Sequence, residues 1–116
     1  MSDLIEFKGG DTIKQKVIIK KKSTGVSENI PTSTVIEAFV IEPKRRKVLI
    51  SAVPVVHTDP NNDWPNGVLY FEFDNANTSI LNQYDQQEVL LALRLTVDSE
   101  PTTLTSPVKA VRMPLN

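Results

Sequence analysis

Cysteine is absent from the 116-residue sequence, and this absence excludes several classes of protein. A chain without cysteine has no disulfide scaffold, no thiolate nucleophile and no zinc site built on thiolate ligands. It fits a reducing compartment. Chains of about 100 residues commonly fold without such supports, and 40% of these residues are hydrophobic. The length therefore predicts a single domain over residues 1–116.

Histidine and the sequence motifs of enzymes are also scarce. His57 is the single histidine, and a serine or threonine nucleophile usually needs such a base beside it. The sequence contains no G-x-S-x-G motif. Carboxylate pairs, such as Asp59 with Asp63 or Glu72 with Asp74, are usually solvated. We predict a protein that is not an enzyme, with no catalytic residues and no cofactor.

Long hydrophobic runs are lacking too, and no segment approaches the roughly 20 residues that span a bilayer. The first residues, MSDLIEFKGGD, contain neither a basic start nor an apolar stretch, which predicts no signal peptide and no membrane contact. The FKGGDT segment lacks the lysine of a phosphate-binding loop. We interpret it as a tight turn in which Gly9 and Gly10 adopt positive φ and the Asp11 side chain caps the turn.

The net charge is only −1, which gives no overall attraction to nucleic acid. The charge is nevertheless uneven, because residues 1–50 have a balance of +4 and residues 51–116 a balance of −5. Two basic clusters are present, Lys20, Lys21 and Lys22, and Lys44, Arg45, Arg46 and Lys47. No aromatic residue adjoins either cluster, so nucleic-acid binding is not predicted. The clusters are interpreted either as solvated strand ends or as a basic face that docks an acidic partner or a second copy.

Apolar and polar residues alternate along most of the chain, as in half-buried strands. The expected strands are a short segment before the double glycine and residues 12–21, 34–42, 47–56, 67–74, 87–98 and 104–115. Without a helix of useful length, this pattern predicts an all-β fold, a single antiparallel β-sandwich of about seven strands. Pro54, Pro107 and Pro114 indicate edges or bulges in two of the strands.

One face of each strand supplies the expected core. The inward residues are Ile13, Val17, Ile19, Val35, Phe39, Ile50, Leu69, Phe71, Leu91, Leu93 and Leu95. The third strand is apolar on its other face as well, which indicates cover on both sides. Residues 77–83 predict a helical turn, capped by Asn77 or Thr78, that closes one end of the core with Ile80 and Leu81. Residues 22–33 form a long polar loop that we expect to be mobile.

The segment HTDPNNDWPNG, residues 57–67, admits three interpretations. Asp59, Asn61 and Asp63 alternate like the first ligands of a calcium loop, but Trp64 and Tyr70 stand where such a loop needs glycine and glutamate. Asp-Pro, Asn-Asn and Pro-Asn-Gly are turn sequences, which indicates a plain hairpin connection. The third interpretation is a contact surface with a partly exposed Trp64. If Trp64 is not exposed, it forms a lid over the end of the core.

The order of features resembles a known family. The turn Gly10-Asp11-Thr12, the element from Ile80 to Tyr84 and the strand from Leu91 to Thr96 are similar to those of immunoglobulin-like modules in tailed bacteriophages. The similarity is to the N-terminal domain of the upper baseplate protein family. This chain departs from the family at Asn82 and Gln83, where a glycine usually precedes the tyrosine, and it lacks the family's long C-terminal part.

The resemblance implies an immunoglobulin-like sandwich in a non-enzymatic particle protein of the tail, baseplate or fibre attachment. Such a protein is made in the host cytoplasm, becomes part of the virion, and contacts other virion proteins. The residues expected to form the interaction surface are Trp64, Asp63, Tyr70, Lys20, Lys22, Lys44, Arg45 and Arg46. A head-to-tail homo-oligomer, with a basic edge against an acidic edge, fits the charge split. The first alternative is a carbohydrate- or ligand-binding β-sandwich with Trp64 and Tyr70 as stacking platforms for a sugar. The second alternative is an accessory domain of an enzyme.

Overall fold

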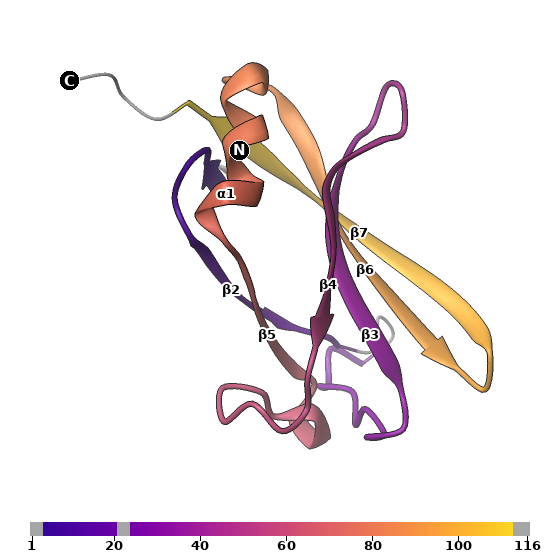
Figure 1. Ribbon diagram of the computed structural model, residues 1–116. Coiled ribbons are helices and arrows are strands. Elements are labelled where there is room, and N and C mark those ends of the chain that lie inside the picture. The colour runs from indigo at the N-terminus through magenta and orange to yellow at the C-terminus, as the bar shows by residue number, and fades with distance from the viewer. Residues whose placement is uncertain (1–3, 21–23, 113–116) are drawn as a thin grey trace.

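The computed structural model describes residues 4–20 and 24–112 (Figure 1). Most of these residues lie in strands, as the alternating pattern predicts. The strands are β1 (Glu6–Lys8), β2 (Ile13–Ile18), β3 (Val35–Glu42), β4 (Lys47–Val55), β5 (Val68–Phe73), β6 (Glu88–Val97) and β7 (Glu100–Val111). Three short helical segments complete the description, η1 (Trp64–Asn66), α1 (Asn75–Thr78) and η2 (Ser79–Tyr84). None of the helices within the described ranges has the length and apolarity to cross a membrane.

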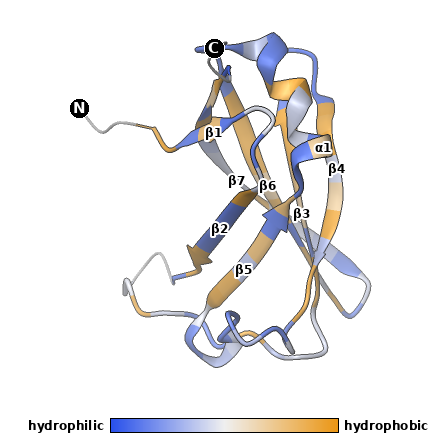
Figure 2. Cartoon of the chain, turned by 60° about the vertical axis from the view of Figure 1, so that its left-hand side comes forward, coloured by the Kyte–Doolittle hydropathy of each residue, from blue (hydrophilic) through white to orange (hydrophobic). Residues whose placement is uncertain are grey.

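The strands form two sheets. The larger sheet has the order β1-β7-β6-β3-β4, and the smaller sheet pairs β2 with β5. In the small sheet, β5 lies on the side of β4, and β2 lies on the side of β1 and β7 (Figure 2). All pairs are antiparallel except β1 with β7, which are parallel. The expectation of a wholly antiparallel fold is therefore wrong at this pair, because the chain enters the large sheet beside its final strand.

The core forms where the buried faces of the two sheets meet. Of the predicted core residues, six are buried and Val17, Ile19 and Leu95 are partly buried against them. The six are Ile13, Ile50, Leu69, Phe71, Leu91 and Leu93. Each such side chain contributes roughly 1.5–3 kcal/mol when it leaves water. The leucine-rich segment that could also have been a helix is the strand β6, and its inner residues Leu91 and Leu93 lie in the core.

The inner face of β3 was predicted wrongly. Val35 is 59% exposed and Phe39 is only half-buried, whereas Ile36, Ala38 and Val40 are buried. The register explains this result, because Ile36, Ala38 and Val40 stand beside the inner leucines of β6. The outer face of β3 is covered by a side chain of the neighbouring strand.

That covering side chain is Arg94 of β6. Its guanidinium lies 5.5 Å from the centroid of the Phe39 ring, and its Nη2 lies 2.7 Å from Oε1 of Glu37. Both members of this ion pair are partly exposed, so the pair itself adds at most about 1 kcal/mol. The stem and the guanidinium plane still shield an aromatic ring from water.

The helical turn closes one end of the core, as predicted, with Leu81 fully buried. Its first part, α1, is capped by Asp74, whose Oδ1 accepts a hydrogen bond from the Asn77 N–H at 2.9 Å. An aspartate in extended backbone just before the first turn is well placed to satisfy a free N–H there. The predicted residue Thr78 stands at the N-cap position of η2, but its side chain makes no capping hydrogen bond there. Thr78 is instead buried and serves the neighbouring glycine turn.

The glycine turn between β1 and β2 is held by that threonine. The hydroxyl of Thr78 donates to the Asp11 carbonyl at 2.7 Å and accepts from the Gly10 N–H at 3.1 Å. The predicted cap from the Asp11 side chain is therefore corrected. Gly10 has the predicted positive φ of 86°, but Gly9 does not. Gly9 is required for space, because a Cβ there would lie 2.6 Å from the Asn82 side chain.

Candidate interaction surface

The loop from His57 to Gly67 folds its tryptophan into the protein. Trp64 is 3% exposed and belongs to the core cluster. Its indole Nε1 donates to Oδ1 of Asn62 at 3.0 Å, and the His57 ring packs edge-on with the ring centroids 5.4 Å apart. The expectation of a partly exposed Trp64 is therefore wrong. The side chain is a lid over one end of the core, so it offers no stacking face to a partner or a sugar.

Asn62 fixes this lid to the edge of the small sheet. Its side-chain amide donates to the Tyr70 carbonyl at 3.1 Å, and its Oδ1 accepts from the Tyr70 N–H at 3.0 Å. Asp63 forms an antiparallel bridge with Val68 on the same edge. The outer edge of β5 is thus occupied by the loop itself. Gly67 permits this arrangement with a φ of 73°, at a place where a Cβ would lie 2.6 Å from the Ile19 carbonyl.

The acidic side chains of the loop serve its turns. Asp59 Oδ1 accepts from the Asn61 N–H at 2.8 Å, and Asp63 Oδ2 accepts from the Asn66 side-chain amide at 2.8 Å. Such local hydrogen bonds from aspartate side chains stabilise turns, whereas in a calcium loop these oxygens would converge on one ion. Over the described parts of the chain, no group of three or more histidine, cysteine, aspartate or glutamate residues is placed to hold a metal ion.

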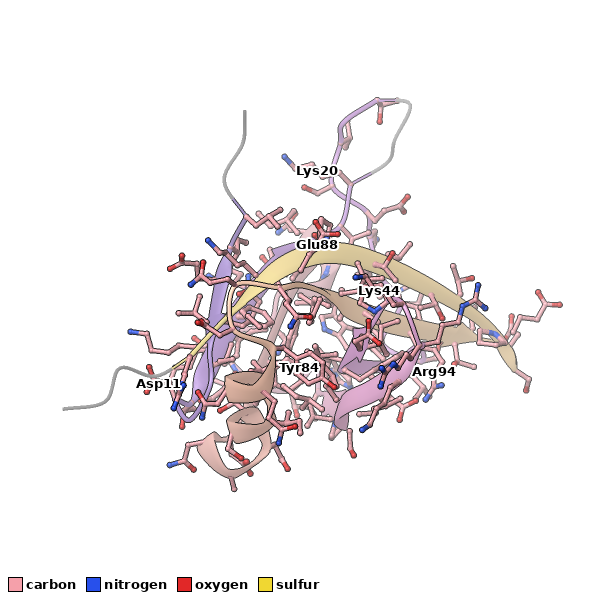
Figure 3. The ribbon with its side chains drawn as sticks, turned by 90° about the horizontal axis from the view of Figure 1, so that it is seen from above. Asp11, Lys20, Lys44, Tyr84, Glu88 and Arg94 are labelled. Atoms are coloured by element: carbon pink, nitrogen blue, oxygen red, sulfur yellow. The ribbon has the colours of Figure 1, made fainter. Side chains whose placement is uncertain are left out.

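The described members of the two basic clusters lie apart from each other. Lys20 is exposed at the end of β2, and Lys44 lies at the tip of the β3–β4 hairpin, well apart from it (Figure 3). Arg45 and Arg46 are exposed at the same tip. The tip is ordered by the buried Glu42, whose carboxylate accepts from the N–H groups of Lys44 at 2.7 Å and Arg45 at 2.9 Å. The predicted residue Lys22 lies outside the described residues.

The remaining predicted residues lie on or beside the small sheet. Asp63 is exposed, and Tyr70 is half-buried on the outward face of β5. Tyr70 stands opposite Lys16, and Lys14 stands opposite Glu72. The outward face of β2 therefore carries a row of lysines, with one glutamate across the sheet from the first of them.

A groove that the sequence did not indicate lies between β2 and the large sheet. Its volume is about 380 Å³, and residues from β2, β6 and β7 line it. The apolar lining includes Val17, Ile19, Leu91, Leu93, Leu104 and Val108. Ile5 closes one end and is 57% exposed, and Leu104 is 41% exposed. The groove exists because the large sheet has five strands and the small sheet only two.

Comparison of the chain with protein-family models, with curated proteins and with solved structures finds no match.

Proposed function

We propose that this chain is a non-enzymatic assembly protein that works through contacts with other proteins. The observation that carries the proposal is the apolar groove beside β2. Large hydrophobic side chains at its rim, Ile5 and Leu104, are substantially exposed. Contiguous apolar surface of this kind, rimmed by polar residues, is typical of an interaction site. The polar residues at the border of this groove include Lys16 and Lys20.

The particle context of the proposal comes from the resemblance to tailed-bacteriophage modules. We propose an immunoglobulin-like β-sandwich that sits in a phage or prophage particle, at the tail, the baseplate or a fibre attachment. The two sheets that share one core support the sandwich part of this proposal. The partners are then other virion proteins.

Mass spectrometry of particles purified from the producing culture tests the particle context. The chain should be present in a fixed ratio to the other particle proteins and should stay with them through a density gradient. A chain found only in the unassembled fraction would refute the proposal. The carbohydrate-binding alternative is not favoured, because its main stacking platform, Trp64, is buried.

A further inference from the structure

The exposed edges of sheets in this protein are mostly blocked. A free edge presents unpaired N–H and C=O groups, and proteins commonly interrupt such edges with proline, bulges or short strands. β4, the last strand of the large sheet, contains Pro54. Its pairing with β3 also shifts register on either side of Val40 of β3. At the other side, β1 has only three residues and leaves most of β7 as the edge.

The edge of β7 is interrupted by two prolines. The Lys109 N–H donates to the Ile5 carbonyl, so the odd-numbered residues of β7 direct their backbone groups away from β6. Pro101 and Pro107 stand at positions of this parity, and proline has no N–H to offer. A strand that approached β7 would therefore lack donors near both ends.

Within residues 4–20 and 24–112, the edge of β2 is the exception. The Ile19 N–H donates to the Gly67 carbonyl on the side of β5. Alternation along the strand then turns the backbone groups of Lys14, Lys16 and Ile18 toward the open side. β2 contains no proline and shows no register shift against β5. The Lys16 carbonyl accepts from the Gln15 side-chain amide at 3.1 Å, a weak local bond that an incoming strand would replace.

The groove lies directly beneath this open edge. A third strand beside β2 would place alternate side chains into the groove, where Leu91 and Leu93 form part of the lining and Leu104, next to Leu93, is exposed. Side chains of a strand point alternately to opposite faces. The segment that fits must therefore be apolar at every second position.

The charge of β2 defines the other positions of that segment. Lys14, Lys16 and Lys20 are exposed on the outward face, the face on which the partner's remaining side chains would lie. Opposite charges across strands are stabilising, and like charges directly opposite are destabilising. Acidic residues at these positions therefore fit. A second copy of β2 does not fit, because antiparallel pairing would set lysines against lysines.

We propose that β2 binds an extended segment of a partner protein as a third strand of the small sheet, with apolar residues facing the groove and aspartate or glutamate facing outward. This inference rests on the proposed role in protein assembly and specifies its mode, which is strand addition. Main-chain bonds to residues 14, 16 and 18 provide affinity, and the groove and the lysines provide specificity.

Binding of a labelled peptide tests the proposal. The probe is a synthetic peptide of about nine residues in which valine alternates with glutamate, compared with a scrambled peptide of equal composition and with a valine–lysine peptide. Fluorescence anisotropy should show binding of the first only, weakened by salt. Amide exchange should slow at Lys14, Lys16 and Ile18 when the peptide binds, because their N–H groups enter a ladder.

Two variants and a control localise the binding. Lys16→Pro removes one open N–H without removing a bond to β5. It should weaken binding of the peptide roughly tenfold, because one hydrogen bond at the edge is lost and the proline ring alters the local backbone. Lys16→Glu keeps the backbone and should also weaken binding through charge. Thr103→Pro places the same imino acid on the edge that prolines already interrupt, and should leave binding unchanged. The emission of the buried Trp64 reports whether each variant is folded.

Several outcomes would overturn the inference. These are no binding of the alternating peptide to the folded protein, equal binding by Lys16→Pro and Thr103→Pro, or protection of the β2 amides by self-association without peptide. The outcome of the peptide-binding experiment can be distinguished from the outcome of the particle experiment. A protein found in particles that binds no such peptide loses only this inference, whereas one that binds the peptide but is absent from particles loses only the particle assignment.

Discussion

Single polar side chains close the loops of this protein onto its core. Asn62 joins the indole of Trp64 to the backbone of Tyr70, and Thr78 joins the helical turn to the glycine turn. The sequence alone does not distinguish these residues from their neighbours. Asn61 and Asn62 are adjacent and identical in type, yet Asn61 is exposed whereas the side-chain amide of Asn62 donates to the Tyr70 carbonyl. Which asparagine bonds depends on the distant strand that it meets.

Asn62→Ala should lower the free energy of unfolding by about 2–4 kcal/mol, because the side chain makes three hydrogen bonds and its loss leaves their partly buried partners on Trp64 and Tyr70 unsatisfied. Urea denaturation followed by Trp64 fluorescence measures this effect. Asn61→Ala is the matched control, and it should change stability by less than about 0.5 kcal/mol because that side chain is exposed. Equal effects of the two substitutions would contradict the role assigned to Asn62.

Thr78→Val should destabilise the protein by about 1–3 kcal/mol, since the isosteric change removes the hydroxyl that serves Gly10 and Asp11. Thermal unfolding followed by circular dichroism provides the measurement. Thr78→Ser retains the hydroxyl and loses one methyl group, so its cost should be smaller, about 1 kcal/mol. A serine variant as unstable as the valine variant would show that packing, not hydrogen bonding, is what the position requires.

At the scale of elements, the strands were predictable and the pairing was not. Period-two alternation located six of the seven strands, and a polar turn with glycine located the first. Pro54 correctly indicated an edge, and Pro107 an edge over most of β7. The parallel pairing of β1 with β7 joins segments about a hundred residues apart in the chain. No local pattern encodes such a contact.

β3 shows why the burial of a strand can be misread. Its two faces are both apolar, Val35 and Phe39 on one and Ile36, Ala38 and Val40 on the other, so periodicity alone could not choose between them. The choice is made by register against β6. The same dependence on neighbours hid the groove, because the residues that line it look like ordinary core positions in the sequence.

A pair of threonine substitutions tests the orientation of β3. Ile36→Thr should lower the free energy of unfolding by about 1–3 kcal/mol, because it buries a hydroxyl and removes apolar volume at a position that is 2% exposed. Val35→Thr, at a position that is 59% exposed, should change it by less than about 0.5 kcal/mol. Chemical denaturation compares the two variants. The reverse order would support the face that the sequence suggested.

At the scale of the molecule, charge is separated between two hairpin tips. The β3–β4 tip carries Lys44, Arg45, Arg46 and Lys47, and the β6–β7 tip carries Asp98 and Glu100. The tips point in different directions, the first upward and the second downward in Figure 1. This geometry allows a basic tip of one copy to meet an acidic tip of the next, which is the head-to-tail contact expected of the charge split.

Sedimentation velocity should therefore detect association that is strongest at low salt and declines as salt is added, because exposed charges are screened. Arg45→Glu should weaken the association, since it reverses a charge at the basic tip. Lys8→Glu, an exposed reversal in β1 away from that tip, is the control and should weaken it less. A species that stays monomeric at every salt concentration would remove the head-to-tail contact, while the binding of a strand at β2 would be unaffected.

The parallel pairing of β1 with β7 has a mechanical consequence. The chain enters β1 at Ile5 and leaves β7 at Arg112, and these points lie at opposite ends of the paired segment, which runs from Glu6 and Lys109 to Lys8 and Val111. Tension applied through the flanking chain would pull the two strands along their length in opposite directions. The hydrogen bonds that join Ile5 to Lys109 and Gly9 to Val111 would then be loaded together rather than broken one after another. The three residues of β1 thus form a short hydrogen-bonded segment that resists shear between the two ends of the domain.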